Sequence, residues 1–382
     1  MTDQSQADRN LDAVPNQWRE PLARLHQIDQ KLLDLIRERA EIAVDLAKLQ
    51  KSLELPSYDP EREEQALALI ERYNTERGSK LSRASIRAIF REIQSACAVL
   101  EAPLKVGYLG PPGTFSHIAA RSNFGLAVTY LDFPSISGIF GAVERGRLDY
   151  GVVPIENSTE GGVTFTLDSF LTSNAKICGE FLLDVTVCVV GKNPDLSKLE
   201  RIYSHPQPLG QCRAWLAQHV PQAQLVSMPS TIAAAREAAN DENSAALASH
   251  LAAELQGLDV LAESIQDMTV NVTRFVLLSM TEAPPSGRDR TSIVFSTKDE
   301  KGALLTALTI FNNAGINLSR IESRPAREKL WEYVFFTDVE GHRTDPGVAQ
   351  AIEDLRKVSR MVRVLGSYPQ ARRSAAGAEP PR

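Results

Sequence analysis

Cysteine and long apolar runs are both scarce in this sequence. Its 382 residues include four cysteines, and no two of them form a CxxC pair. We therefore expect neither a disulfide framework nor a zinc site, and no other metal ligands, and we expect a reducing compartment with a cytoplasmic location. The four cysteines are Cys97, Cys178, Cys188 and Cys212.

No apolar run reaches the 18 residues that a membrane-spanning helix needs. The best candidate, from Phe181 to Val190, is ten residues long and contains Asp184, so a membrane partner is excluded. The polar, acidic N-terminus does not resemble a signal peptide. A net charge of −6 and a pI of about 5.7 argue against nucleic acid as a partner.

The sequence changes character three times, as expected for a chain that is long enough for two or three domains. Hydrophobic residues make up 43% of it, which supports several cores without disulfides or metals. The predicted fold class is multidomain, with an all-α unit, a two-lobed α/β unit and a small α/β unit. We predict disordered tails over 1–16 and 370–382, a helical unit over 17–102, a two-lobed unit over 103–281, a linker over 282–290 and a small α/β unit over 291–369.

The helical unit begins with a heptad pattern. From Leu25 to Leu53, apolar residues recur at alternating steps of three and four, which is typical of a coiled-coil helix. A helix of about 30 residues is about 45 Å long, too long for the rest of this unit to cover, so we predict a homodimer or a higher homo-oligomer. Arg39 interrupts the pattern, and it is either an arginine that lies along a helix interface or an anion-binding cation in the helical core.

Several strands of the central unit end in polar residues. The strand Lys105 to Leu109 runs into a glycine-rich loop ahead of a helix, where unpaired N–H groups suit an anion. The dinucleotide pattern GxGxxG is absent. Polar strand ends in one α/β domain commonly converge on a cleft. Those in this unit are Thr114, Ser116, Glu156, Asn157, Ser204, His205, Gln207, Thr273 and Arg274.

The C-terminal unit has the predicted order βαββαβ. Strands are expected near 291–296, 316–324, 331–339 and 362–368, and helices near 302–313 and 348–357. This order is the ferredoxin-like plan. Its sheet has an exposed edge, which favours side-by-side pairing of two copies.

Three phrases of the central unit, taken together, resemble the prephenate dehydratase family: Val153 to Ser158, Tyr203 to Pro208 and Asn271 to Phe275. The resemblance implies a two-lobed clamp like periplasmic binding proteins, with prephenate as substrate and no cofactor. It implies Thr273, Glu156 and Asn157 as catalytic residues, with Thr273 as a donor within a relay and Glu156 as a proton source if burial raises its pKa. The implied substrate-binding residues are Thr114, Ser116, Ser204, His205, Gln207, Arg274 and Phe275, with pairing between Arg274 and Glu156 as the alternative for that arginine.

Residues 28–43 and 59–63 resemble an all-helical chorismate mutase domain. The resemblance implies chorismate as a candidate substrate and Arg39, Asp59, Arg62 and Glu63 as its site. The chain departs from the family at four polar positions, where the family normally has arginine, lysine, serine and glutamine. We therefore predict a weak mutase or a dimerising relic, with a fully bifunctional mutase and dehydratase as the alternative. The four departures are Leu22, Gln50, Cys97 and Glu101.

The C-terminal unit resembles an ACT regulatory domain in two phrases. The resemblance implies that phenylalanine binds there as a feedback effector. Arogenate as the substrate, and a non-enzymatic amino-acid sensor, are the alternatives for the whole chain. The implied effector-binding residues are Gly302, Ala303, Leu304 and Leu305 in the first phrase and Glu322, Ser323, Arg324 and Pro325 in the second.

Overall fold

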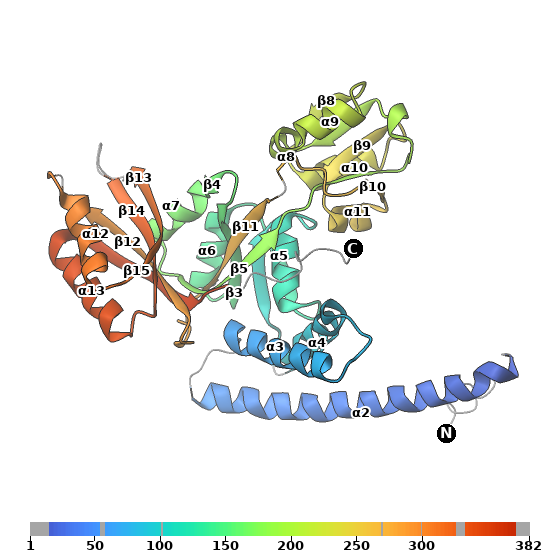
Figure 1. The fold of residues 1–382 in the computed structure, drawn as a ribbon, viewed down its shortest axis with the longest axis horizontal. Helices are drawn as coiled ribbons and strands as arrows, with labels where there is room; N and C mark the ends of the chain where they lie inside the picture. Colours follow the sequence, from blue (N-terminus) through green and yellow to red (C-terminus); the bar gives the residue numbers. More distant parts are fainter. Residues whose placement is uncertain are drawn as a thin grey trace.

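The computed structural model describes residues 15–53, 58–100, 102–268, 270–298, 300–325 and 333–371. Glu101 and most of the two predicted tails lie outside these residues. Figure 1 shows a helical unit at the bottom, two α/β lobes in the middle and at the upper right, and a third α/β unit at the left. None of the described helices combines the length and the apolar character that a membrane crossing requires.

The helical unit contains α2 (Asn16–Ser52), α3 (Pro60–Glu76) and α4 (Arg83–Ala98). Helix α3 begins where the Asp59 carboxylate accepts hydrogen bonds from two N–H groups of its first turn, and α4 begins at the Ser82 hydroxyl in the same way. Helix α2 extends beyond the other two helices (Figure 1). The heptad prediction is confirmed, since the apolar residues of that pattern lie on one long helix and are all exposed. They are Leu25, Ile28, Leu32, Leu35, Ile42, Leu46 and Leu49, and the exposed Leu53 follows directly after the helix ends at Ser52.

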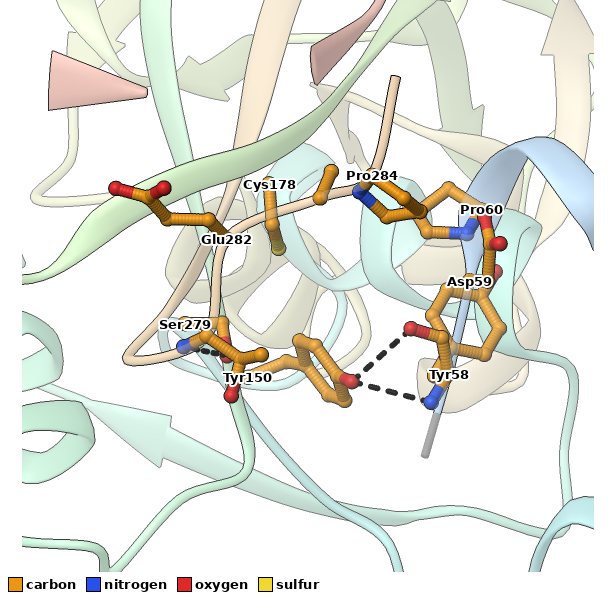
Figure 2. A pocket seen from close by; sticks show the side chains of 10 residues that line it. Tyr58, Asp59, Pro60, Tyr150, Cys178, Ser279, Glu282 and Pro284 are labelled. Carbon is orange, nitrogen blue, oxygen red and sulfur yellow. Dashed lines mark hydrogen bonds between the residues drawn. The ribbon is translucent and has the colours of Figure 1, made fainter. Parts of the chain in front are cut away.

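The first lobe and the helical unit meet at an aromatic contact. The ring of Tyr58 lies 4.6 Å from that of Phe124, and the Tyr150 hydroxyl donates to the Tyr58 carbonyl at 3.2 Å. A hollow opens beside this contact, and its lining includes Pro60, Cys178, Ser279 and residues 281–284 (Figure 2). The hollow therefore lies between the start of α3 and the first lobe, where the helical unit meets that lobe.

Two mixed sheets form the two lobes. The first sheet has the order β2-β1-β3-β11-β5, with β4 on β3, and the second has the order β10-β6-β9-β7-β8. The chain crosses between the lobes twice, after β5 and before β11, so β11 returns to the centre of the first sheet. The first lobe contains β1 (Lys105–Leu109), α5 (Phe115–Phe124), β2 (Thr129–Phe133), α6 (Ile136–Glu144), β3 (Tyr150–Asn157), β4 (Gly161–Gly162), α7 (Thr164–Thr172), β5 (Lys176–Asp184) and β11 (Val272–Ser279). The second contains β6 (Cys188–Gly191), β7 (Arg201–Ser204), α8 (Pro206–Gln211), α9 (Arg213–His219), β8 (Gln224–Ser227), α10 (Thr231–Ala238), β9 (Ser244–Ala248), α11 (His250–Gln256) and β10 (Asp259–Ala262), with a 3₁₀ turn at Leu196–Lys198.

The C-terminal unit has the predicted βαββαβ order. It consists of β12 (Asp289–Thr297), α12 (Ala303–Asn313), β13 (Leu318–Pro325), β14 (Tyr333–Glu340), α13 (Pro346–Val358) and β15 (Ser359–Pro369). The sheet order is β13-β14-β12-β15, so β13 is an edge strand. On the other edge, β15 lies so close to β5 that a Cβ atom on Gly366 would be 2.1 Å from the Ile177 carbonyl oxygen. The end of the predicted linker is ordered, because β12 begins at Asp289, whose carboxylate accepts from Ser286 and Gly287.

Candidate active site

The ends of β3 and β11 form a polar pair in the first lobe. The two strands are antiparallel, and Thr273 lies directly opposite Asn157. The Asn157 Nδ2 donates to Thr273 Oγ1 at 2.9 Å and to Asn271 Oδ1 at 3.0 Å, while its Oδ1 accepts from the Thr159 and Glu160 N–H groups. These bonds fix the orientation of the amide. Because Thr273 accepts from Asn157, its hydroxyl hydrogen points elsewhere and is available to a substrate.

The same hydrogen-bond chain reaches the second lobe. Asn271 Nδ2 donates to Gln211 Oε1 at 3.1 Å, and Gln211 Nε2 donates to Glu160 Oε1 at 3.5 Å. Gln211 ends α8, so a second-lobe side chain contacts both polar strand ends of the first lobe. The sequence prediction missed Asn271 and Gln211, although Asn271 opens the phrase that contains Thr273. The position of Asn271 within that phrase, two residues before Thr273, was the available signal.

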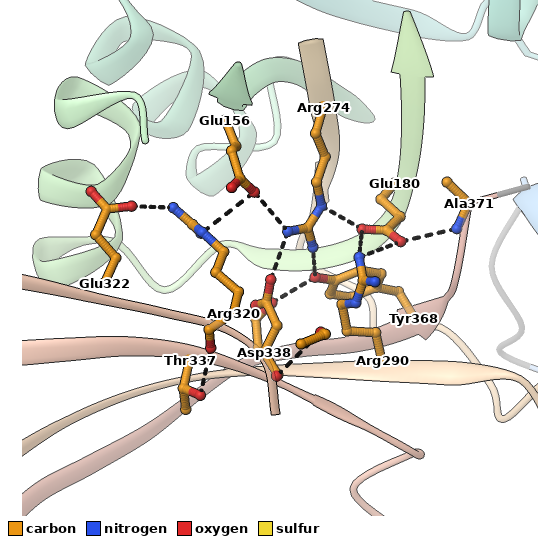
Figure 3. Close-up of polar contacts among 12 residues, drawn as sticks. Glu156, Glu180, Arg274, Arg290, Arg320, Glu322, Thr337, Asp338, Tyr368 and Ala371 are labelled. Atoms are coloured by element: carbon orange, nitrogen blue, oxygen red, sulfur yellow. Dashed lines mark hydrogen bonds and ion pairs between the residues drawn. The ribbon is translucent and has the colours of Figure 1, made fainter. Parts of the chain in front are cut away.

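Arg274 lies on the opposite face of β11 from Thr273, as the two-residue period of a strand requires. Its guanidinium donates to Glu180 and to Asp338, each at 2.6 Å, and to the Tyr368 hydroxyl at 3.0 Å (Figure 3). Burial opposes its charge, but Tyr368, Asp338 and Glu180 raise the pKa of Arg274 well above its usual range. Protein groups occupy this buried side chain, so the structure supports the pairing alternative for Arg274, and its predicted contact with substrate stays a prediction.

Glu156 lies on the same face of the sheet as Arg274, opposite the face that carries the Thr273 hydroxyl. Its Oε2 lies 3.5 Å from Arg274 Nη1 and 3.4 Å from Arg320 Nε, and its side chain is 38% exposed. The alternative pairing of Arg274 with Glu156 is present. The burial that a proton source at Glu156 requires is absent, and its carboxylate lies on the face away from the Thr273 hydroxyl. The geometry therefore gives the catalytic role predicted for Glu156 no support.

Two further predicted substrate contacts are enclosed within the protein. Phe275 is 1% exposed, and its ring stacks on Phe181 at 5.9 Å. Ser204 is fully buried, and its hydroxyl donates to the Leu247 carbonyl at 2.8 Å. Both side chains are enclosed and occupied by protein groups, so the geometry does not support their predicted substrate contacts, which stay predictions.

Thr114, Ser116, His205 and Gln207 lie at the starts of two helices. Thr114 caps α5, accepting from the His117 N–H and donating to the Leu109 carbonyl. His205 caps α8, because its Nδ1 accepts from the Gln207 N–H at 3.3 Å. The Ser116 side chain is buried on the first turn of α5. Over the described residues, no hydrogen bond joins any of these four to Thr273 or Asn157, so their substrate contacts stay predictions.

The residues of the mutase-like site lie together in the helical unit. Arg39 Nη1 donates to Cys97 Sγ at 3.1 Å, which joins α2 to α4, and Arg62 lies 3.6 Å from Glu63. Burial raises the pKa of Glu63, against the opposing effect of Arg62 and Arg39. The Asp59 carboxylate caps α3. The contact with Cys97 places Arg39 between α2 and α4, which fits both interpretations of this arginine, so its role as an anion-binding cation stays a prediction.

The two predicted effector phrases occupy different elements of the C-terminal unit. Gly302 has a φ of 80°, which favours glycine, and it precedes Ala303, Leu304 and Leu305 in the first turn of α12. The second phrase, 322–325, ends the edge strand β13. Arg324 Nη1 donates to Thr164 Oγ1 at 2.9 Å and so reaches α7 of the first lobe. Neither a hydrogen bond nor an ion pair between described residues joins the two phrases within one chain.

Comparisons with known proteins agree with the order of these units. Family comparison matches residues 22–102 to chorismate mutase type II, 106–283 to prephenate dehydratase and 291–357 to the ACT domain. The bifunctional chorismate mutase/prephenate dehydratase of Aquifex aeolicus is 42% identical over 348 residues, which cover 91% of this chain and 96% of the relative.

Two solved structures also resemble the chain. The prephenate dehydratase of Arthrobacter aurescens in complex with L-Phe is 39% identical with a TM-score of 0.65, covering 70% of this chain and 90% of that one. GqqA, described as a novel type of quorum quenching acylase, is 30% identical with a TM-score of 0.64, covering 69% of this chain and 97% of that one. With its three domains in this order and 42% identity over nearly its whole length, the chain belongs to the family of bifunctional chorismate mutase/prephenate dehydratases.

Proposed function

We propose that Thr273 and Asn157 form the reaction centre of this prephenate dehydratase. The observation that carries the proposal is the 2.9 Å bond from Asn157 Nδ2 to Thr273 Oγ1, which directs the hydroxyl hydrogen away from Asn157. In the reaction, the bond from the ring to its hydroxyl breaks, and the hydroxyl takes up a proton and leaves as water. The bond to the ring carboxylate also breaks, its electron pair enters the aromatic ring, and CO₂ leaves.

Thr273 donates a hydrogen bond to the departing hydroxyl as part of a relay, because a threonine hydroxyl is too weak an acid to act alone. Asn157 holds the threonine in place, and Asn271 holds Asn157. We propose Ser116 and the first-turn N–H groups of α5 as anion contacts for a substrate carboxylate, with His205 and Gln207 from the second lobe. No cofactor enters this scheme.

The test is incubation of the full chain with prephenate, with and without L-phenylalanine, while phenylpyruvate is measured. We expect phenylpyruvate to form and phenylalanine to slow its formation. A parallel incubation with arogenate decides between the two substrates. Binding of prephenate without any turnover would contradict the proposal and favour the amino-acid sensor.

We propose that the helical domain is a weak mutase or a relic. Arg39, Arg62 and Glu63 lie together, but Leu22 and Gln50 replace two cations of the family pattern, and the dianion chorismate requires cations. The relatives' names favour the bifunctional alternative, and a chorismate assay decides between the two.

Phenylalanine is the proposed effector of the ACT domain. The solved Arthrobacter relative carries L-Phe, and the second effector phrase of this chain lies on the edge strand β13. Calorimetry with L-phenylalanine tests this proposal, and absence of heat together with unchanged activity would count against it.

We also propose a homodimer or a higher homo-oligomer in the cytoplasm. The support is the exposed apolar face of α2 and the unpaired edge of β13. Light scattering tests the oligomer, and a monomeric mass at micromolar concentration would contradict it. Cell fractionation tests the location.

A further inference from the structure

Charged side chains of the ACT domain reach the strand ends that carry the proposed reaction centre, on the face opposite Thr273 and Asn157. Arg320 lies on β13, its side chain is almost completely buried, and its Nε lies 3.4 Å from Glu156 Oε2. Glu156 is paired across the strands with Arg274, and each of these residues precedes or follows a residue of the reaction centre. Arg320 therefore contacts the end of β3 that carries Asn157, from the face opposite the Thr273 hydroxyl. Figure 3 shows Arg320 beside Glu156.

Arg320 has a second carboxylate partner within the effector phrase. Its Nη2 donates to Glu322 Oε2, so one guanidinium serves Glu156 with its Nε and Glu322 with an Nη. Figure 3 shows Arg320 between these two carboxylates. The planar fork of arginine allows this double contact, which a lysine ammonium cannot reproduce in the same geometry.

Glu322 also lies directly against the hairpin that follows Asn157. A Cβ atom on Gly162 would be 2.0 Å from Glu322 Oε2, and β4 pairs with β3 through Gly162 opposite Glu156. Two residues along β13, Arg324 contacts Thr164 at 2.9 Å and Asp168 at 3.7 Å. The second effector phrase thus contacts the segment 156–168 at several points.

We propose that Arg320 is a positioning residue for the dehydratase site, and that an amino-acid effector controls it through Glu322. This inference rests on the proposed effector role of phenylalanine. The ammonium group of an α-amino acid would form an ion pair with the Glu322 carboxylate. Once Glu322 is engaged, the Arg320 guanidinium shifts toward Glu156 and displaces the end of β3, which changes the contact between Asn157 and Thr273. The two sites are coupled because they share one guanidinium.

The test compares Arg320→Gln with Arg343→Gln in the full-length protein. Arg343 is a matched control, because it is also an arginine of the ACT domain. It pairs at 2.8 Å with Glu282, a carboxylate outside the ACT-domain sheet, and it does not contact Glu156. For Arg320→Gln we expect kcat to fall at least about tenfold with KM changed less than about threefold, and inhibition by L-phenylalanine to be largely lost, while calorimetry still shows L-phenylalanine binding. Arg343→Gln should behave like the wild type in all three measurements.

The inference would be overturned if Arg320→Gln had the same kcat, and the same inhibition by L-phenylalanine, as Arg343→Gln. If the wild-type enzyme is not inhibited at all, the effector role itself fails, and the kcat of Arg320→Gln alone then decides whether Arg320 positions the site. The double variant Arg320→Gln/Glu156→Gln should be no slower than the slower single variant, because both act through one contact. Fully additive losses would contradict this.

Arg320→Lys keeps the inference testable if Arg320→Gln does not fold. It retains the charge but not the fork, so we expect a folded enzyme with reduced inhibition by L-phenylalanine. Inhibition at the wild-type level in Arg320→Lys would overturn the inference.

Discussion

Consecutive residues of β11 lie in two different environments. Thr273 faces Asn157 and the polar chain that leads to the second lobe, whereas Arg274 faces Glu180 and Asp338 at the ACT domain. The strand thus holds a small neutral donor on one face and a permanent cation on the other. In the proposed reaction centre, this arrangement keeps the arginine away from prephenate, where a cation would over-stabilise the carboxylate that must leave.

Replacing Thr273 with valine tests the proposed catalytic role of its hydroxyl. Valine keeps the shape and removes the hydroxyl, so we expect kcat for prephenate to fall at least about 100-fold. The fold should survive, because Asn157 Nδ2 retains its bond to Asn271. Phenylpyruvate formation and thermal unfolding are the measurements. Thr273→Ser is the control, since it keeps a hydroxyl at the same position and should stay much closer to the wild type. Wild-type turnover in Thr273→Val would refute the role of the hydroxyl.

Strands of both the first lobe and the ACT domain contribute to a charged cluster between these two units. Arg274 on β11 and Arg290 on β12 both donate to Glu180 on β5, while Asp338 on β14 accepts from Arg274 and from the Ser292 hydroxyl. Removing one member of such a buried group leaves its partner charged and unpaired, which costs far more than a surface pair is worth. The boundary between these two domains therefore depends on complete pairing.

Asp338→Asn tests that dependence and predicts a pH effect. Burial raises the pKa of Asp338, but Arg274 and Arg320 outweigh it and hold the pKa below its usual range. A lowered carboxyl pKa stabilises the folded state above the ordinary pKa of about 4, and this contribution is lost as the pH falls through the folded-state value. At pH 7 we expect Asp338→Asn to lower the free energy of unfolding by about 3–5 kcal/mol, with the deficit shrinking as the pH falls below about 4.

The measurement is denaturant unfolding of the wild type and of Asp338→Asn at several pH values. Asp354→Asn is the matched control, because Asp354 pairs with Lys357 on the exposed face of α13 and its replacement should change stability little. Equal stability of the two variants at pH 7 would show that the cluster contributes nothing at the domain boundary.

The sequence predicts elements better than it predicts which side chains meet. The heptad steps predicted α2, and the order of apolar runs predicted the βαββαβ unit, since both depend on local periodicity. From the sequence, Glu156 and Asn157 were assigned to one catalytic site, although adjacent residues of a strand face opposite sides, and the structure separates them in this way. The partners of Glu180 and Asp338 were not predictable, because a charge inside an apolar strand indicates that a partner exists but not where in the chain it lies.

At the scale of the molecule, the first lobe holds the other units together. The helical domain attaches to it through Tyr58, and the ACT domain attaches through β15 and the charged cluster. The second lobe is joined to it by the two crossing segments, by Gln211 and by the Ser249 hydroxyl on the Gly113 carbonyl. This arrangement suits a clamp in which the second lobe moves and the regulatory contacts act on the lobe that stays fixed.

The helical domain predicts a difference between the two activities of one protein. Gln50 is buried near the end of α2, and at 100° per residue it points within about 20° of Arg39, where the family pattern has a lysine. We expect the full chain to convert chorismate far more slowly than prephenate, because a missing cation opposite a buried charge costs about two to three decades in rate. Gln50→Lys should raise kcat/KM for chorismate at least about tenfold and leave prephenate turnover unchanged, whereas Gln30→Lys, the same change on the exposed part of α2, should alter neither. A wild-type protein that converts chorismate as fast as prephenate would show that Gln50 and Leu22 do not limit the mutase, and would make the enzyme fully bifunctional.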